Sequence, residues 1–225
     1  MIRTAFIAGV ILLLSSVTPA QKNGPSGTQA SDHPSGASNV TPALPHDRHD
    51  GMIISADPYT DAGRAKDKFG KSNPLAVGIL PLEVSIQNET SEPIRIDMDT
   101  IQLEVYVANS GRQDIAALGV AEVADLIVHP KGATAPTTRR FPIGIPVSSA
   151  DKKVQKVADD LQPFALDVSI VPPMGKVHGF LFFNMSRDMA LVKTSSLYVP
   201  DLIAMRSSKP LLFFEIPLGP DAPVQ

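Results

Sequence analysis

The feature that most constrains the fold is a strict alternation of apolar and polar residues that begins at Leu80. The apolar members are Leu80, Leu82, Val84 and Ile86, and the residues between them are Pro81, Glu83, Ser85 and Gln87. A period of two places all the apolar side chains on one face of an extended chain. The segment therefore predicts a β-strand with one face in a core.

A second alternating segment follows the polar stretch Asn88–Pro93. Its apolar members are Ile94, Ile96 and Met98, which predicts a hairpin with the first strand. From Ile101 to Val107 the apolar residues occupy odd positions instead of even ones. Because a shift of one residue turns side chains to the other face, we expect a bulge or a corner near Asp99–Thr100.

The middle of the chain has a helical pattern. Between Gln113 and His129 the apolar residues recur at helical spacing, with Asp114 as a candidate N-cap and Pro130 as the end. A second helix is expected after Ser148 or Ser149 and before Pro163. The sequence thus predicts a helical insertion over about residues 113–163.

Strand patterns return after this insertion. The predicted strands are Phe164–Val171, Val177–Met185, Leu197–Val199 and Leu211–Leu218. The run Phe180–Phe183 is apolar throughout, which is typical of a strand covered on both faces. Between the first two strands, Pro172–Gly175 reads as a turn in which Gly175 is free to take a positive φ. Short strands with hairpin turns favour a mainly β fold, an antiparallel β-sandwich.

Two of these segments resemble bacterial extracytoplasmic immunoglobulin-like domains. The stretch from Leu82 to Ile96 is similar to their first hairpin, in which an Asn-led polar turn is followed by Pro-Ile. The stretch from Ile170 to Phe183 is similar to a later Pro-Pro-Gly hairpin. The resemblance implies an antiparallel immunoglobulin-like β-sandwich of unknown function, and it carries no activity to this chain.

The N-terminus predicts export. Arg3 precedes ten apolar or glycine residues, Ala5–Leu14, and Thr18 and Ala20 fit the positions before a cleavage site. This run is half of the roughly 20 residues that a spanning helix needs, so residues 1–20 read as a cleaved signal peptide. We expect a secreted chain, periplasmic or extracellular, without a membrane span after cleavage.

Residues 21–50 are rich in Pro, Gly and Ser and hold only Val40 and Leu44 as large aliphatic residues. Such a segment buries too little apolar surface to offset the entropy of ordering, which predicts a disordered tether. Residues 51–225 are left for a single β-sandwich domain with the helical insertion. Because the chain has no Cys, disulfides and thiolate sites are excluded and the core alone must stabilise it.

The most suggestive cluster for chemistry is His46-Asp-Arg-His-Asp50. His46, Asp47, His49 and Asp50 are candidate ligands of a divalent metal, with Asp57 or Asp61 to complete the shell. The simpler interpretation is a charged junction between tether and body. Spacing alone does not impose the geometry that a metal requires, so no cofactor is the first expectation and a divalent metal the alternative.

Other site patterns are sparse. A net charge of -3 argues against nucleic-acid binding, and the sequence lacks the nucleophile-elbow and phosphate-loop motifs. Glu83 and Glu104 are expected to face solvent, whereas Glu215 interrupts an apolar run and reads as a partly buried carboxylate or an edge-strand charge. Without Trp, a carbohydrate binder would depend on three tyrosines, Tyr59, Tyr106 and Tyr198.

The sequence therefore favours an exported, non-catalytic binding or structural module of the cell envelope or extracellular space, with a protein partner in the envelope. The alternative is a metal-dependent extracytoplasmic hydrolase that uses the His46/His49/Asp cluster.

Overall fold

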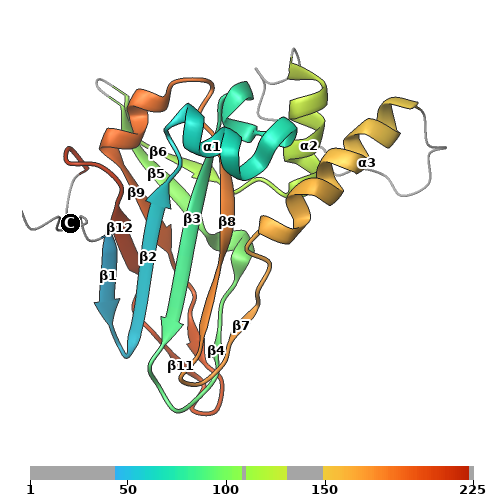
Figure 1. Ribbon diagram of the computed structural model, residues 1–225. Helices are drawn as coiled ribbons and strands as arrows, with labels where there is room; N and C mark the ends of the chain where they lie inside the picture. The colour runs from blue at the N-terminus through green and yellow to red at the C-terminus, as the bar shows by residue number, and fades with distance from the viewer. Residues whose placement is uncertain (1–43, 108–109, 131–148, 223–225) are drawn as a thin grey trace, which may run out of the picture. The chain divides into compact units, whose positions relative to one another are not determined.

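The computed structural model divides the chain into two units, Met1–Thr41 and Pro42–Gln225. The structure describes residues 44–107, 110–130 and 149–222, all of which belong to the second unit. This unit is mainly β, with antiparallel pairing in three sheets, A, B and C, and few helices (Figure 1). The predicted mainly β class is confirmed, and the arrangement is consistent with a β-sandwich. The segments predicted as a signal peptide and, for the most part, as a tether lie outside the described residues.

Sheet A carries the longest strands, in the order β1-β2-β3-β8. Their bounds are His46–His49 (β1), Met52–Pro58 (β2), Ile79–Asn88 (β3) and Lys176–Asn184 (β8). The alternation from Leu80 to Gln87 thus lies in a strand, as predicted, and this strand is central in its sheet.

Sheets B and C are built from shorter strands. Sheet C has the order β12-β9-β5-β6, and its strands are Phe214–Pro217, Ser195–Val199, Gln102–Val107 and Gly111–Ala116. Sheet B has the order β11-β10-β4-β7, and its strands are Lys209–Pro210, Ile203–Ala204, Ile94–Arg95 and Ile170–Val171.

The predicted hairpin between the first two strands is wrong. β3 pairs with β2 and β8, whereas β4 pairs with β7 and β10 in sheet B. Local alternation identifies strands but not their partners, and here the polar segment after Asn88 carries the chain from one sheet to another. The expected corner is present as a 3₁₀ turn, Met98–Thr100, between β4 and β5. At this turn the apolar residues change from even to odd positions.

One core joins the three sheets. Its buried side chains come from β2 and β3 of sheet A, from β5, β9 and β12 of sheet C, and from β4, β7 and β10 of sheet B. Examples are Ile54, Leu82, Leu103, Leu197 and Ala204. Burial of this apolar surface is the main favourable contribution to folding in a chain without disulfides.

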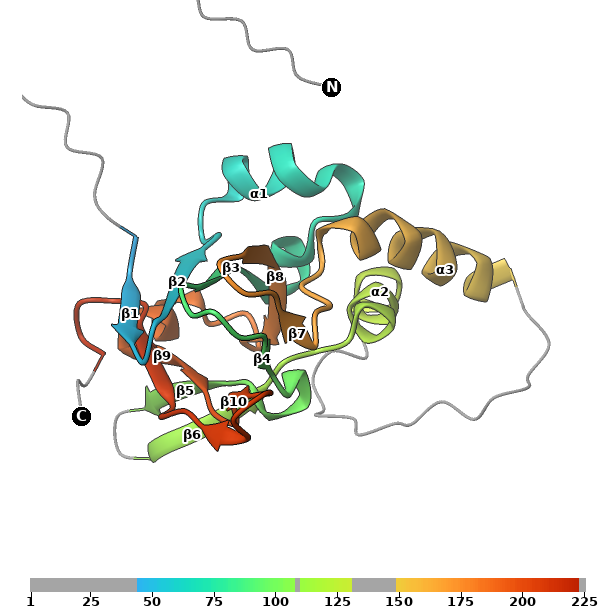
Figure 2. The same cartoon turned by 90° about the horizontal axis from the view of Figure 1, so that it is seen from below.

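The other face of sheet A is covered by helices, which are α1 (Ala62–Phe69), α2 (Val120–Val128) and α3 (Ser149–Leu161). Figure 2 shows α1 on one side of β3 and β8, and β5, β6 and β9 on the other. In β8, Phe180 and Phe182 pack in the cluster with the helices, while Leu181 and Phe183 belong to the core between the sheets. The run is therefore covered on both faces, as predicted.

The helical insertion begins later than predicted. Gln113 and Asp114 lie in β6, so Asp114 is not an N-cap, and α2 begins after Gly119. This segment pairs with β5 through backbone hydrogen bonds, and these bonds favour the extended conformation over the helix that the residue spacing suggests. α2 ends just before Pro130 and α3 just before Pro163, both as expected.

Two further predictions change, the tether over residues 21–50 and the strand over Phe164–Val171. Ordered structure begins before residue 51, because His46–His49 form β1 and the two-residue loop Asp50–Gly51 joins it to β2. Both loop residues have a positive φ, 48° and 75°, which is the type I′ geometry that Asp-Gly favours. The segment expected as a strand over Phe164–Val171 forms a strand only at Ile170–Val171, after a 3₁₀ turn at Gln162–Phe164 and an isolated bridge between Ala165 and Phe180.

Among the described residues no helix has the length and apolar character that would let it cross a membrane.

The double coverage of β8 makes a testable prediction about stability. Phe182 is 1% exposed and lies edge-on to Phe69 of α1, so Phe182→Asp should lower the free energy of unfolding by about 4 kcal/mol or more through a buried unpaired charge. Leu212→Asp, at a side chain 66% exposed, is the matched control and should change it by less than about 0.5 kcal/mol. Urea titration measures both; equal midpoints would show that Phe182 is not a core residue.

Candidate functional site

Four turns gather at one end of the sheets, at the bottom of Figure 1. They are Asp50–Gly51, Glu89–Pro93, Pro172–Gly175 and Met205–Ser208, and we call this region the turn end. Backbone hydrogen bonds join them: Glu89 N donates to Gly51 O, Met174 N to Thr90 O, and Met205 N to Pro93 O. The turns that carry the sequence resemblance are thus held against one another.

Asn88 is the centre of this region. Its side chain is fully buried, and its Nδ2 donates to the carbonyl oxygens of Glu92 (2.8 Å), Pro172 (3.0 Å) and Val171 (3.3 Å). Its Oδ1 accepts from the backbone N and the Oγ1 of Thr90, at 2.9 and 2.7 Å. One amide therefore forms hydrogen bonds with backbone groups of two separate turns. Its own polar atoms are satisfied in this way, as buried polar groups must be.

Glu92 connects the third turn. Its Oε2 accepts hydrogen bonds from the backbone N of Arg206 and of Ser207, both at 3.0 Å, and its Oε1 accepts from Ser207 Oγ at 3.0 Å. The hydrogen bonds donated by the Ser207 backbone and its neighbours lower the pKa of the Glu92 carboxyl. The β10–β11 turn is thus fixed by an ionised carboxylate.

Exposed methionines project from these fixed turns. Met174 is 74% exposed and Met205 44% exposed. Met174 has a φ of 50°, an unfavourable region for a residue with a side chain, and Gly175 has no room for a Cβ because the Pro172 ring would lie 2.5 Å from it. The positive φ expected at Gly175 is therefore found at Met174 instead. A strained backbone that presents an apolar side chain to solvent is typical of a recognition surface.

Two ion pairs lie at the turn end. Arg48 binds Glu89 at 2.8 Å, and Lys209 lies 3.9 Å from Asp50. Asp50 also accepts a hydrogen bond from Leu212 N at 3.2 Å. The turn end thus combines exposed apolar side chains with ion-paired ones, a mixture that protein interfaces also show.

The candidate metal ligands lie next to this region on β1. Successive strand residues point to opposite faces, so His46 is on one face of β1 and Asp47 and His49 are on the other. Asp47 accepts hydrogen bonds from Glu215 N (3.1 Å) and contacts His49 Nδ1 (3.2 Å), and His49 stacks on Phe214 with ring centroids 3.8 Å apart. Within the described ranges, no group of three or more His, Asp or Glu side chains has the arrangement of a metal site.

The two aspartates expected to complete the shell have other partners. Asp57 forms an ion pair with Arg64, and Asp61 caps α1 by accepting from Arg64 N at 2.7 Å. The structure thus brings Asp47 and His49 together and leaves the remaining candidates apart. The same carboxylates have structural roles that need no metal.

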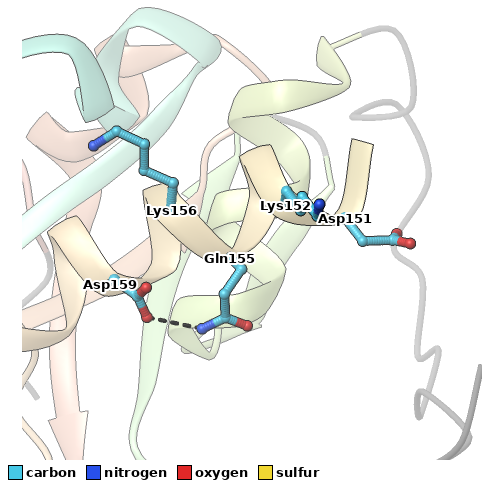
Figure 3. Close-up of a pocket in the computed structure, with 5 residues that line it drawn as sticks. All are labelled: Asp151, Lys152, Gln155, Lys156 and Asp159. Atoms are coloured by element: carbon cyan, nitrogen blue, oxygen red, sulfur yellow. Dashed lines mark hydrogen bonds between the residues drawn. The ribbon is translucent and has the colours of Figure 1, made fainter. Parts of the chain in front are cut away.

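A shallow hollow of about 350 Å³ lies along α3 and is shown in Figure 3. All five lining residues come from that helix: Asp151, Lys152, Gln155, Lys156 and Asp159. Gln155 Nε2 donates to Asp159 Oδ1 at 2.8 Å, a pairing that occurs on ordinary exposed helices. Residues of a single helix do not surround a ligand, so the turn end is the better candidate.

The sequence predicted two of the four turns, Asn88–Pro93 and Pro172–Gly175, but not the residue that joins them. Asn88 was read only as the start of a polar turn, because nothing in the local pattern indicates that its amide is buried. The Asp50–Gly51 dipeptide is a hairpin signal that was overlooked within the Pro- and Gly-rich stretch.

Comparisons with known proteins name no function. No protein-family model matches the chain, and no curated protein matches it. A solved structure of a functionally unknown protein from Listeria monocytogenes EGD-e is similar over 77% of this chain and 80% of that one, at 15% identity and a TM-score of 0.35.

The Asn88 network predicts a large loss of stability on truncation. Asn88→Ala should lower the free energy of unfolding by about 3 kcal/mol, because several buried backbone groups lose their partner. Asn73→Ala is the control: its side chain accepts one hydrogen bond, from Leu75 N, and its loss should cost about 1 kcal/mol. Chemical denaturation compares them, and a loss at Asn88 no larger than at Asn73 would contradict the central role.

The lowered pKa of Glu92 predicts a pH dependence with a definite sign. A carboxyl whose pKa is lower in the folded state than its ordinary value of 4.5 stabilises the fold fully at pH values above 4.5. This contribution is lost as pH falls through the folded-state pKa. Wild type should therefore exceed Glu92→Gln in melting temperature at pH 7. The difference should shrink as pH falls below 4.5 and vanish once pH lies below the lowered pKa of the folded state. A difference that does not depend on pH would show that the charge of Glu92 is not what fixes the turn.

Proposed function

We propose that the chain is an exported, non-catalytic binding module of the cell envelope or extracellular space, and that its turn end contacts a protein partner. The observation that carries the proposal is Met174, an apolar side chain that is 74% exposed on a strained, hydrogen-bonded turn. The export signal and the tether, both expected from the sequence, belong to this proposal.

The chemistry of the turn end suits a protein partner. Methionine is unbranched and polarisable, so it adapts to irregular apolar pockets. Burial of one such side chain contributes about 1.5–3 kcal/mol. Because hydrogen bonds donated by Asn88 and accepted by Glu92 already fix the turns, binding loses little conformational freedom.

The immunoglobulin-like character of the sandwich is part of the same proposal. Two observations support it: antiparallel sheets enclose a shared core, and the turns between strands of different sheets meet at one end. In sandwich domains that bind through loops, such clusters supply the contact residues.

Site-directed crosslinking tests the proposal in the cells that produce the chain. A photoreactive amino acid at position 174 should yield a discrete adduct with one envelope protein, and Met205→Asp should reduce its yield at least about fivefold, because a charge in an apolar contact is costly. Position 152 on α3, in the hollow of Figure 3, is the control and should yield no such adduct.

The readout separates the outcomes. The same adducts from positions 174 and 152, or none from position 174, would overturn the proposal. The melting temperature of Met205→Asp should stay within about 2 °C of wild type, since the side chain is exposed, which distinguishes lost binding from lost folding.

A further inference from the structure

The outer face of sheet C carries a cluster of polar side chains away from the core. Register places Glu104 of β5 opposite Asp114 of β6 and opposite Ser196 of β9. It also places Glu215 of β12 opposite Tyr198 of β9. Residues directly opposite in antiparallel strands share a face with Cβ atoms about 5 Å apart, so all five side chains lie on one side of the sheet.

Glu104 is buried in this cluster, which corrects the expectation that it faces solvent. Its side chain is 1% exposed and forms an ion pair with Arg112, whose Nε also donates to Asp114 at 2.9 Å. Burial is the main cause that raises the pKa of Glu104, and the nearby Glu215 carboxylate adds to it, while Arg112 opposes it. The structure thus holds two carboxylates near each other with one guanidinium.

Three buried polar atoms on this face make no hydrogen bond within the described part of the chain. One of them, Glu104 Oε1, forms an ion pair with Arg112, and the other two have neither kind of partner among the described residues. They are Glu215 Oε1 and Ser196 Oγ, and Ser196 is fully buried. A buried acceptor without a donor costs about 1–3 kcal/mol, so natural proteins rarely leave one. Since β9 lies between β5 and β12, Ser196 lies between the strands that carry the two carboxylates. The oxygens of Ser196 and Glu215 therefore have lone pairs that accept no hydrogen bond from the described residues.

The rings beside the cluster favour a cation. The Arg112 guanidinium lies 5.9 Å from the centre of the Tyr198 ring, and Phe213 lies 5.3 Å from the same ring. Aromatic faces attract cations within about 6 Å. Glu104, Glu215 and Asp114 carry three negative charges against one positive charge on Arg112, a formal balance of -2. An anion would be repelled from this face.

We propose that the outer face of sheet C binds an alkylammonium group between Glu215, Ser196 and the Tyr198 ring. An ammonium has three donors and no acceptor, which matches the unpartnered oxygens of Glu215 and Ser196. Arg112 occupies the equivalent position beside Glu104, so the protein itself already supplies one cation to this face. The site is separate from the turn end and does not depend on the function proposed for it.

Such an ammonium group has two sources, a free diamine or a lysine side chain of another protein. Isothermal titration calorimetry of the full chain at low salt, with 1,5-diaminopentane and with Nα-acetyl-lysine methylamide, measures both. We expect saturable binding of at least one probe, and the tighter probe identifies the source. Methyl β-glucoside is the neutral probe; if it binds as tightly as the amines, a carbohydrate explains the face and the proposal fails.

Matched variants assign the binding to these residues. Glu215→Gln removes the charge but keeps the shape, and it should weaken amine binding about tenfold or more, because charge-assisted hydrogen bonds are the strong ones. Asp167→Asn removes the same charge from an exposed position outside sheet C and should leave the affinity within about twofold. Absence of binding by either amine at about 10 mM, a level that detects even weak complexes, would overturn the site. An unchanged affinity in Glu215→Gln would do the same.

Discussion

The structure depends on the burial of β3 and β8 between two apolar layers. One face of these strands packs on the strands of sheets B and C, and the other packs on α1, α2 and α3. Phe180 and Phe182 meet Phe69 of α1 through edge-to-face contacts, with ring centroids 5.0 and 6.3 Å apart. In a chain without disulfides, this burial is the main contribution that holds the sheets and helices together.

The same arrangement produces both surfaces that we consider functional. Chain crossings from sheet A to sheet B place turns at one end, where a buried amide on Asn88 joins them. Sheet C uses its inner face for the core, so its outer face is free to carry Glu104, Glu215 and Arg112. The proposed sites thus lie outside the apolar core. One consists of turns at the end of the sheets, and the other is the face of sheet C that does not pack in the core.

Sequence reasoning succeeded where a signal was local and failed where it depended on distant partners. The alternation at Leu80–Gln87 and the apolar run Phe180–Phe183 identified strands, because burial of one or both faces dictates those patterns. Helical spacing at Gln113–Asp114 was misleading, since pairing with β5 overrides local propensity. The hairpin expected after Asn88 failed for the same reason.

The candidate sites follow the same division. The sequence by itself determined the class of fold, the strands with their buried faces, the proline stops of α2 and α3, and the absence of disulfides, because each follows from a residue type or a short period. Only the tertiary structure decided that Asn88 is buried, that β1 places His46 and His49 on opposite faces, and that Glu104 and Glu215 lie near each other. These facts depend on contacts between residues far apart in the chain. No local sequence pattern specifies which distant strands pair or which sheets pack together.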